Sequence, residues 1–366
     1  RWQEGLVPQS GITQEEHSEY RSFFSHKESW HRKKGRDGRP AFAIPLEESS
    51  HDPEILALDR ISMKNYLDQE GFLSPLLHWY VNYCCRDDYG QSHSQVSAWA
   101  GLHYFASRTG KAANAPPGAV LTWPEGNGWL VRNLRSRVSD KIQTSSLCHR
   151  IQSKGEEIEI GLLDLSSQQP FRVRSKHLIF AAPRFSAKYL MRDYSSPEPA
   201  YAPWLVANIS LNGLPTGRGA PLSWDNVSFS GRSLGYIVAT HQNLGMKQLQ
   251  TVLTFYQPLD QTDPASARRE ARDRNHSYWA ELVASEMEKM HPGIRARIQR
   301  IDVWIWGHAM ASPGIGFIWG KERKSMLRSS GRIHFAHSDI SGISLFEEAQ
   351  YRGILAAQAI LKEWRA

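Results

Sequence analysis

The stretch that decides the fold lies near the end of the chain, where residues 331–342 read GRIHFAHSDISG and residues 344–357 read SLFEEAQYRGILAA. The first part predicts a buried strand over 331–336 that ends in a turn. The second carries apolar residues at helical spacing and predicts a helix over about 344–364. Free N–H groups at the start of that helix point back at the turn and suit an anion or an electron-rich ring edge. Asp339 at this turn could accept hydrogen bonds from sugar-alcohol hydroxyls, and the alternative is a plain helix cap.

Two further blocks lie upstream of this tail. Residues 123–128 read WPEGNG and precede a helical pattern over 129–139, and the glycines allow tight backbone geometry. Residues 179–183 read IFAAP and close an apolar run that predicts a buried strand over 176–182. Short strands are predicted around and between these blocks, over 119–123, 145–152, 156–165 and 171–173.

The three blocks, in this order, resemble the flavin-containing amine oxidases and the related phytoene-desaturase-like FAD-dependent oxidoreductases. The resemblance spans about residues 119–360. It implies a Rossmann-like FAD-binding domain and non-covalently bound FAD. By resemblance, the backbone at Cys148 approaches the adenine end, Asp339 matches the acidic residue near the ribityl or phosphate region, and the backbone of Phe346 approaches the isoalloxazine ring. The full set of cofactor-binding residues that we predict is Cys148, Ala182, Pro183, His337, Ser338, Asp339, Leu345 and Phe346.

The sequence departs from the family pattern in several places. No GxGxxG opens a strand-to-helix turn, and the nearest match, over 314–320, has the wrong spacing. We therefore expect a C-terminal portion of such an enzyme, without its first βαβ unit and inactive by itself. His337 replaces a glycine of the family. The strand over 204–209 lacks the lysine that many amine oxidases hold there, and no cysteine near the tail could bind flavin covalently.

Three residues are candidates for catalysis. His337 could accept a proton or stabilise the negative charge of reduced flavin, and the alternative is a structural histidine. Asn208 lies on the strand that carries the lysine in the family. Trp306 alternates with Trp304 and His308 on one face of a strand, where the alternative is core packing. A metal site built from His334, His337 and Asp339 lacks a further ligand, so we predict no metal.

The fold class is mixed, α/β with α+β character. It comprises an incomplete, discontinuous Rossmann-like FAD/NAD(P)-binding domain and a substrate domain with an antiparallel sheet and helices. We assign residues 1–118 to an insert and the helical part of the substrate domain, and 119–185 and 311–366 to flavin-binding segments. Residues 186–310 form the rest of the substrate domain. Its strands are predicted over 204–211, 227–229, 234–240, 251–256 and 301–306, with one long helix over 266–290.

Composition and charge limit the classes of partner that the sequence predicts. A formal charge of +7 includes a cluster of five basic residues over 32–39. A solvated loop face explains this cluster better than nucleic-acid binding, because aromatic residues are not interleaved with it. No apolar run is long enough to cross a membrane. Three cysteines favour a cytoplasmic protein, although the chain begins at Arg1 and a periplasmic enzyme would look the same. The oligomeric state stays open.

The function that these features favour is FAD-dependent oxidation. Hydride would move from an amine-like or other small organic substrate to flavin N5, because the cofactor carries the chemistry while the protein orients the reactants. The alternative is a non-catalytic binding protein on the flavin fold or a truncated, inactive fragment.

Overall fold

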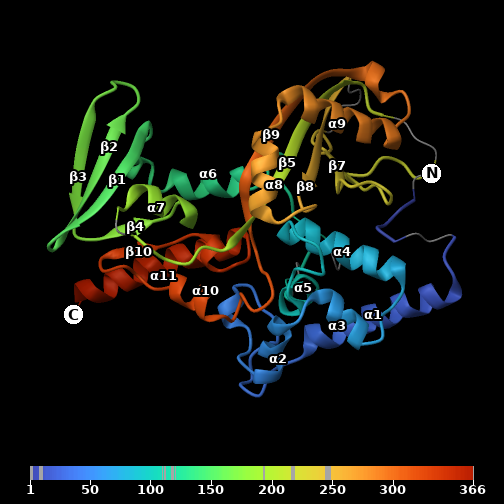
Figure 1. The fold of residues 1–366 in the computed structure, drawn as a ribbon, viewed down its shortest axis with the longest axis horizontal. Coiled ribbons are helices and arrows are strands. Elements are labelled where there is room, and N and C mark those ends of the chain that lie inside the picture. Colours follow the sequence, from blue (N-terminus) through green and yellow to red (C-terminus); the bar gives the residue numbers. More distant parts are fainter. Residues whose placement is uncertain are drawn as a thin grey trace.

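A computed structural model describes residues 3–7, 11–108, 110, 113–116, 119, 121–192, 194–215, 219–243 and 249–365. Figure 1 shows three parts: N-terminal helices, a five-stranded sheet with its own helices, and a smaller part at the C-terminal end of the chain. Across the described residues, no helix combines the length and the apolar character that crossing a membrane requires. Helices and strands are both well represented, which confirms the predicted mixed fold class.

The N-terminal part is helical and packs around one apolar core. Phe23, Leu77 and Trp99 are fully buried in that core. The helices begin at side-chain caps, among them a capping box at Thr13 and the serine caps Ser62, Ser74 and Ser97. Among the described residues before position 60, Phe23, Leu46 and Ile55 are buried in this core. The helices are α1 Gln14–Arg32, α2 Pro53–Ala57, α3 Met63–Gln69, α4 Pro75–Tyr89 and α5 Ala98–Ala106.

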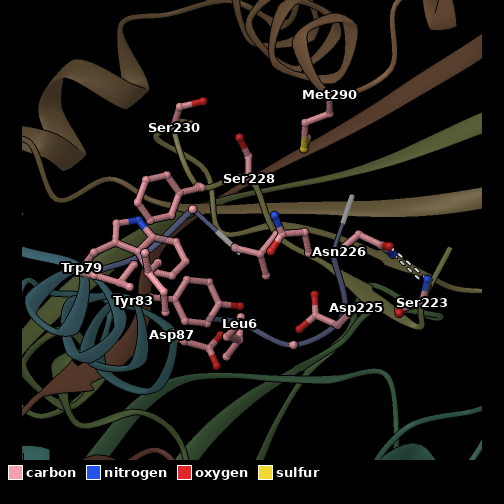
Figure 2. A pocket seen from close by; sticks show the side chains of 18 of the residues that line it. Leu6, Trp79, Tyr83, Asp87, Ser223, Asp225, Asn226, Ser228, Ser230 and Met290 are labelled. Atoms are coloured by element: carbon pink, nitrogen blue, oxygen red, sulfur yellow. Dashed lines mark hydrogen bonds between the residues drawn. The ribbon is translucent and has the colours of Figure 1, made fainter. Parts of the chain in front are cut away.

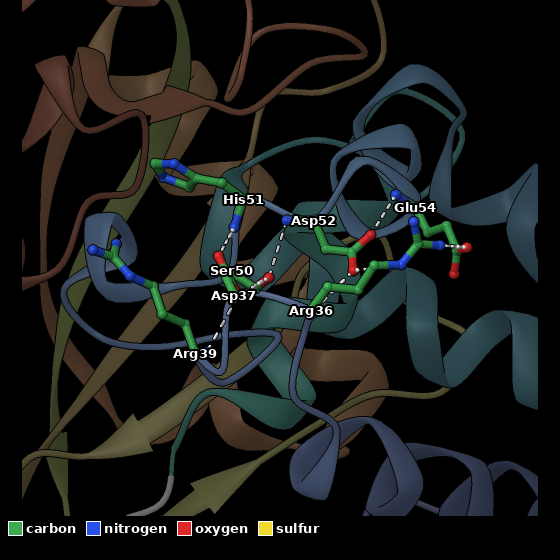
Figure 3. A network of polar contacts seen from close by, with 7 residues as sticks. All are labelled: Arg36, Asp37, Arg39, Ser50, His51, Asp52 and Glu54. Atoms are coloured by element: carbon green, nitrogen blue, oxygen red, sulfur yellow. Dashed lines mark hydrogen bonds and ion pairs between the residues drawn. The ribbon is translucent and has the colours of Figure 1, made fainter.

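The basic cluster after α1 lies in a loop that carries its own counter-charges (Figure 3). The Asp37 carboxylate accepts from the hydroxyl of Ser50 at 2.7 Å and from the backbone N–H of His51 at 2.7 Å. Arg36 pairs with Asp52 at 3.5 Å and with Glu54. The loop is therefore fixed largely by its own polar contacts, as a solvated face would be.

The smaller part combines a middle segment of the chain with the C-terminal tail. Its middle segment forms a three-stranded antiparallel meander, with strands β1 Ser146–Lys154, β2 Glu157–Asp164 and β3 Pro170–Ser175. Figure 1 shows α6, Gly128–Ser136, between this meander and the five-stranded sheet. These elements confirm the predicted hairpin and helix. The predicted strand over 119–123 is wrong, because its described residues form no strand.

The strand of the tail, β10 Ile333–Phe335, pairs in parallel with β4, Leu178–Phe180. Their facing side chains pack with the meander, since Ile151, Ile158, Phe180 and Phe335 share one buried cluster. The short helices α7 Ala187–Leu190 and α10 Lys321–Met326 and the long α11 Phe346–Arg365 complete this part. The tail strand thus lies in a parallel sheet, as the flavin interpretation requires.

The five-stranded sheet has the order β6-β7-β8-β5-β9, and all its pairs are antiparallel. Its strands are β5 Ala200–Asn212, β6 Asp225–Asn226, β7 Gly235–Val238, β8 Gln250–Pro258 and β9 Ile298–Ser312. The predicted strand over 227–229 is wrong, because pairing ends at Asn226. Alternate apolar residues of β5, such as Leu205 and Ile209, are fully buried in the same cluster as Trp279 and Val283 of the helix α9.

The helix predicted over 266–290 is two helices, α8 Pro264–Arg272 and α9 His276–Met290. The chain breaks at Asp273–Asn275 because Asn275 caps the second helix, its side chain accepting from the N–H of Tyr278. The predicted end at Pro292–Gly293 is confirmed, with Gly293 in the left-handed conformation at a φ of +85°.

Candidate functional site

Asp339 lies in the turn after β10, where the sequence predicted a cofactor contact. It is 1% exposed. Its Oδ2 accepts from the hydroxyl of Tyr201 at 2.6 Å and from the backbone N–H of Arg184 at 2.6 Å. Burial would raise the pKa of Asp339, but the surrounding donors lower it below its usual range, so the carboxylate is ionised. One carboxylate therefore ties together the end of β4, the start of β5 and the end of β10.

His337 contacts the same carboxylate. Its Nδ1 is 3.1 Å from Oδ1 of Asp339 and 3.2 Å from the backbone nitrogen of Asp339. Which contact is a hydrogen bond depends on the tautomer, since one ring nitrogen cannot accept and donate at once. Apart from this ring, Oδ1 has no donor among the described residues. This buried oxygen therefore keeps unused acceptor capacity.

A stack of rings flanks this carboxylate. Phe185 lies face to face with His308, their centroids 3.9 Å apart, and both contact the ring of Tyr201. Burial lowers the pKa of His308, and nearby Arg268 and Lys188 lower it further, so the ring is neutral at pH 7. Neutral aromatic rings beside an ionised carboxylate can bind a flat ring that carries hydroxyl groups.

The remaining predicted cofactor residues fall around this turn and on the meander. Ala182 and Pro183 end the segment after β4, Ser338 opens the turn itself, and Phe346 begins α11. Leu345 packs against the N-terminal core instead.

Cys148 lies on β1, next to a hollow of about 880 Å³. This hollow is bordered by His149 and by Arg150, Arg184, Arg192 and Arg328. Its cationic lining suits anionic groups.

Asn208 and Trp306 do not join the turn. Asn208 lies seven residues along β5 from Tyr201, or about 23 Å at strand spacing, and its Oδ1 accepts from Thr254. Trp306 faces Trp204 across the β5–β9 pair and is 54% exposed. Trp304 and His308 are exposed as well, so the predicted alternation is confirmed and the core-packing alternative is wrong.

A pocket of about 900 Å³ opens between α4 and the loops around β6 (Figure 2). The rings of Trp79 and Phe229 meet at 4.6 Å, and Trp79 stacks on Tyr83 at 5.9 Å. Two carboxylates, Asp87 of α4 and Asp225 of β6, complete the lining near these rings. Aromatic faces together with carboxylates form a site for an organic cation.

The two carboxylates are held in an unusual electrostatic state. Burial raises the pKa of Asp87 to about 7, with the charges of Asp88 and Asp225 adding to the effect against Arg108. Burial also raises the pKa of Asp225, against a hydrogen bond from the hydroxyl of Tyr256 at 2.9 Å. A bound cation would relieve this repulsion, so the pocket favours positively charged ligands.

A short stretch of β5 connects the pocket with the turn. Tyr256, which bonds Asp225, stacks on Trp204 at 6.3 Å. Trp204 lies three residues from Tyr201, about 10 Å along the strand, and Tyr201 bonds Asp339. By register, Asp225 lies level with Asn208 of β5, through Ile237 and Thr254, so the cation pocket lies farther along the sheet than the predicted cofactor turn.

The sequence prediction missed several of these residues. The sequence could have pointed to Arg184, because Arg184 directly follows the IFAAP block. Asp87 and Asp225 had none, because their proximity depends on how α4 packs on the sheet.

No protein-family model and no curated protein matches the sequence. Several solved structures match the fold. Wild-type putrescine oxidase bound to putrescine superposes with a TM-score of 0.65 at 13% identity, over 96% of this chain and 77% of that one. A redesigned variant of putrescine oxidase gives 0.68 at 14% identity, with the same coverage.

This chain has the fold of the amine oxidases. Cyclohexylamine oxidase from Brevibacterium oxydans IH-35A matches too, with a TM-score of 0.62 at 12% identity, over 99% of this chain and 77% of that one. The amine-oxidase fold includes both the five-stranded sheet and the part that carries β4 and β10, because the matches cover almost the whole chain. Identities this low establish the fold alone.

Proposed function

We propose that the protein acts as a flavin-dependent oxidoreductase on a small organic amine that carries positive charge. The observation that carries this proposal is the pairing of Asp87 and Asp225 in an aromatic pocket. The amine-oxidase fold supports the choice of chemistry. Putrescine and cyclohexylamine, named in the matching structures, are both amines of a size that such a pocket accepts.

The turn after β10 fits the sugar-alcohol part of FAD. Oδ1 of Asp339 lacks a donor other than His337, and the Phe185–His308 stack offers a flat wall beside it. In this proposal Asp339, His337 and Ser338 hold the cofactor near its ribityl chain, and the backbone at Cys148 lies near its adenine end. FAD, bound non-covalently, would supply the hydride acceptor.

The residues of the pocket have separate tasks in the reaction. The carboxylates of Asp87 and Asp225 bind an ammonium group and fix its orientation. Trp79, Tyr83 and Phe229 exclude water and add cation–π attraction, which is worth about 1–2 kcal/mol at a desolvated site. Since the pKa of Asp87 is about 7, a cationic ligand binds more tightly as the pH rises through that value.

A second candidate is a binding protein that keeps the fold and the pocket without redox chemistry. The absence of lysine from β5 and the replacement of the family glycine by His337 favour it. Such a protein would bind amines by the same carboxylates but would not reduce flavin.

The deciding experiment uses 1,4-diaminobutane and FAD as probes. We expect isothermal titration to show amine binding that weakens about fivefold in Asp225→Asn, the scale of a lost exposed ion pair, because Asp225 is exposed. Asp140→Asn, which removes an exposed carboxylate remote from the pocket, is the matched control.

Flavin absorbance then separates the two candidates. Anaerobic bleaching of bound FAD by the amine supports the oxidoreductase. Amine binding without FAD uptake or bleaching supports the binding protein. Equal amine affinity in the wild type and in Asp225→Asn would contradict both.

A further inference from the structure

Two histidines and a glutamate meet at the opposite end of β10 from the Asp339 turn. His177 directly precedes β4, His334 lies in β10, and Glu363 lies near the end of α11. The parallel register aligns Ile333 with Leu178, which places the two histidines diagonally across the pair. Their ring centroids are 5.7 Å apart. Three segments far apart in the sequence therefore bring metal-ligand side chains to one place.

Both imidazole rings are largely buried, and among the described residues each has a ring nitrogen without a hydrogen bond. His334 is 3% exposed, and its Nε2 has no partner in the described part of the chain. The side chain of His177 is 6% exposed, and its Nδ1 lacks a hydrogen bond, the nearest acidic oxygen being Oε2 of Glu363 at 3.7 Å. Leaving buried polar atoms unpaired costs about 1–3 kcal/mol each. A native structure with two such atoms side by side calls for a ligand that satisfies both.

We propose that His177, His334 and Glu363 bind a divalent transition-metal ion, with zinc as the best fit. Their ligand atoms, Nδ1 of His177, Nε2 of His334 and a carboxylate oxygen of Glu363, all lie within 4.8 Å of one another. Two imidazoles and a carboxylate are a common zinc set, and the fourth position would take a water molecule. Tetrahedral bonds of about 2.0–2.2 Å need the three atoms somewhat closer together. Glu363 can supply this movement because its side chain is 54% exposed.

A second residue supports this arrangement. Nδ1 of His334, the nitrogen that faces away from the cluster, lies 3.0 Å from the hydroxyl of Ser329. A hydrogen bond at the second nitrogen fixes the orientation of a metal-binding imidazole, and such partners accompany histidine ligands almost always. A plain ion pair between His177 and Glu363 would leave Nε2 of His334 unpaired. A bound metal ion would account for the positions of all three side chains and for the contact of Ser329 with His334.

The ion would fasten the end of α11 to the two parallel strands. It would not touch the turn at Asp339, because that turn follows β10 while the cluster surrounds the strand itself. The site is therefore independent of the proposed function, and binding there would stabilise the folded chain.

The test is metal binding by the whole chain after treatment with a chelator and its removal. We expect one equivalent of Zn²⁺ to bind in isothermal titration and to raise Tm. One equivalent of Co²⁺ should give the intense visible bands of a tetrahedral site. Glu363→Gln should weaken Zn²⁺ binding on the order of 100-fold, and Ser329→Ala should weaken it about tenfold. Both positions tolerate substitution better than the buried histidines do, so the variants should fold.

Glu156→Gln is the matched control, since Glu156 is an exposed glutamate in the turn between β1 and β2. It should bind Zn²⁺ as the wild type does. Two results would overturn the proposal: no stoichiometric uptake of Zn²⁺ by the wild type, or equal uptake by the wild type and Glu363→Gln. The second result would assign the bound metal to other histidines on the surface.

Discussion

The hydroxyl of Tyr201 donates a 2.6 Å hydrogen bond to Oδ2 of Asp339, and both side chains are buried. This bond joins the first residues of β5 to the turn after β10, across two parts of the chain that pack separately elsewhere. Tyr201→Phe removes the hydroxyl and leaves its ring in place. We expect the free energy of unfolding to fall by about 1–2 kcal/mol, measured by urea denaturation.

Tyr189→Phe is the control for this variant, because Tyr189 is 74% exposed. It should change stability by less than about 0.5 kcal/mol. Equal effects of the two variants would show that the bond to Asp339 contributes nothing to stability.

The raised pKa of Asp87 predicts a pH dependence of stability. Its pKa is about 7 in the folded protein and about 3.9 in an unfolded chain. Between these values the folded state retains a proton that the unfolded state has lost, so the free energy of unfolding falls as the pH rises. Asp87→Asn cannot ionise. We expect it to remove this fall and to exceed the wild type at pH 8 by on the order of 2 kcal/mol, since residual solvent contact reduces the full linkage value.

Urea denaturation at pH 5 and pH 8 checks this prediction, with Asp140→Asn as an exposed control. Parallel pH profiles of the wild type and Asp87→Asn would contradict a raised pKa at this residue.

Glu47 compensates two buried arginines, and its loss should be severe. It accepts from Arg323 at 2.6 Å and from Arg352, whose side chains are 2% and 5% exposed. Burial would raise the pKa of Glu47, but the two arginines outweigh this effect and lower it. Glu47→Gln removes the carboxylate that both guanidinium groups pair with and leaves Glu348 as a nearby acidic group, so we expect a loss of about 3 kcal/mol at pH 7.

The stability that Glu47 provides is present above the usual glutamate pKa and is lost as the pH falls through its lowered value. The difference between the wild type and Glu47→Gln should therefore shrink in strongly acidic buffer. Glu48→Gln, at the exposed neighbouring position, should match the wild type throughout. A pH-independent difference would mean that the charge of Glu47 is not the cause.

Gly90 ends α4 where the helix meets β5. Its φ is +65°, and a Cβ atom there would lie 2.5 Å from Cβ of Ala202 and 2.6 Å from Nε1 of Trp204. Gly90→Ala combines left-handed strain with overpacking, for a loss of about 3 kcal/mol. Gly71→Ala has similar strain at a φ of +78° with nothing within 4 Å, and should cost about 1 kcal/mol. The difference between the two denaturation midpoints isolates the contact with β5, and equal midpoints would argue against it.

Local patterns were sufficient to predict much of the fold. The strand and helix of the tail, the meander and the strands of the large sheet follow from periodicity and turn residues over short windows. The break between α8 and α9 was missed although residues 272–277 read RDRNHS, with no apolar residue, and Asn275 is a strong cap residue.

The candidate site was predictable only in part. Asp339 and His337 stand in a recognisable strand–turn–helix pattern, so they were found. Asp87 and Asp225 come together only through tertiary packing, which no local sequence pattern predicts. Asn208 lies about 23 Å along β5 from Tyr201 at strand spacing, and its role stays a prediction.

The parallel pairing of β4 with β10 also has a consequence for how the protein reaches its structure. Residues 181–332 lie between the two strands, and they include the whole five-stranded sheet. Contacts between residues so distant in sequence form late, because closing a long loop costs entropy before the contact repays it. We therefore expect the large sheet to condense first and the tail to dock last. During synthesis, the turn at Asp339 would take shape only when the final helix has emerged.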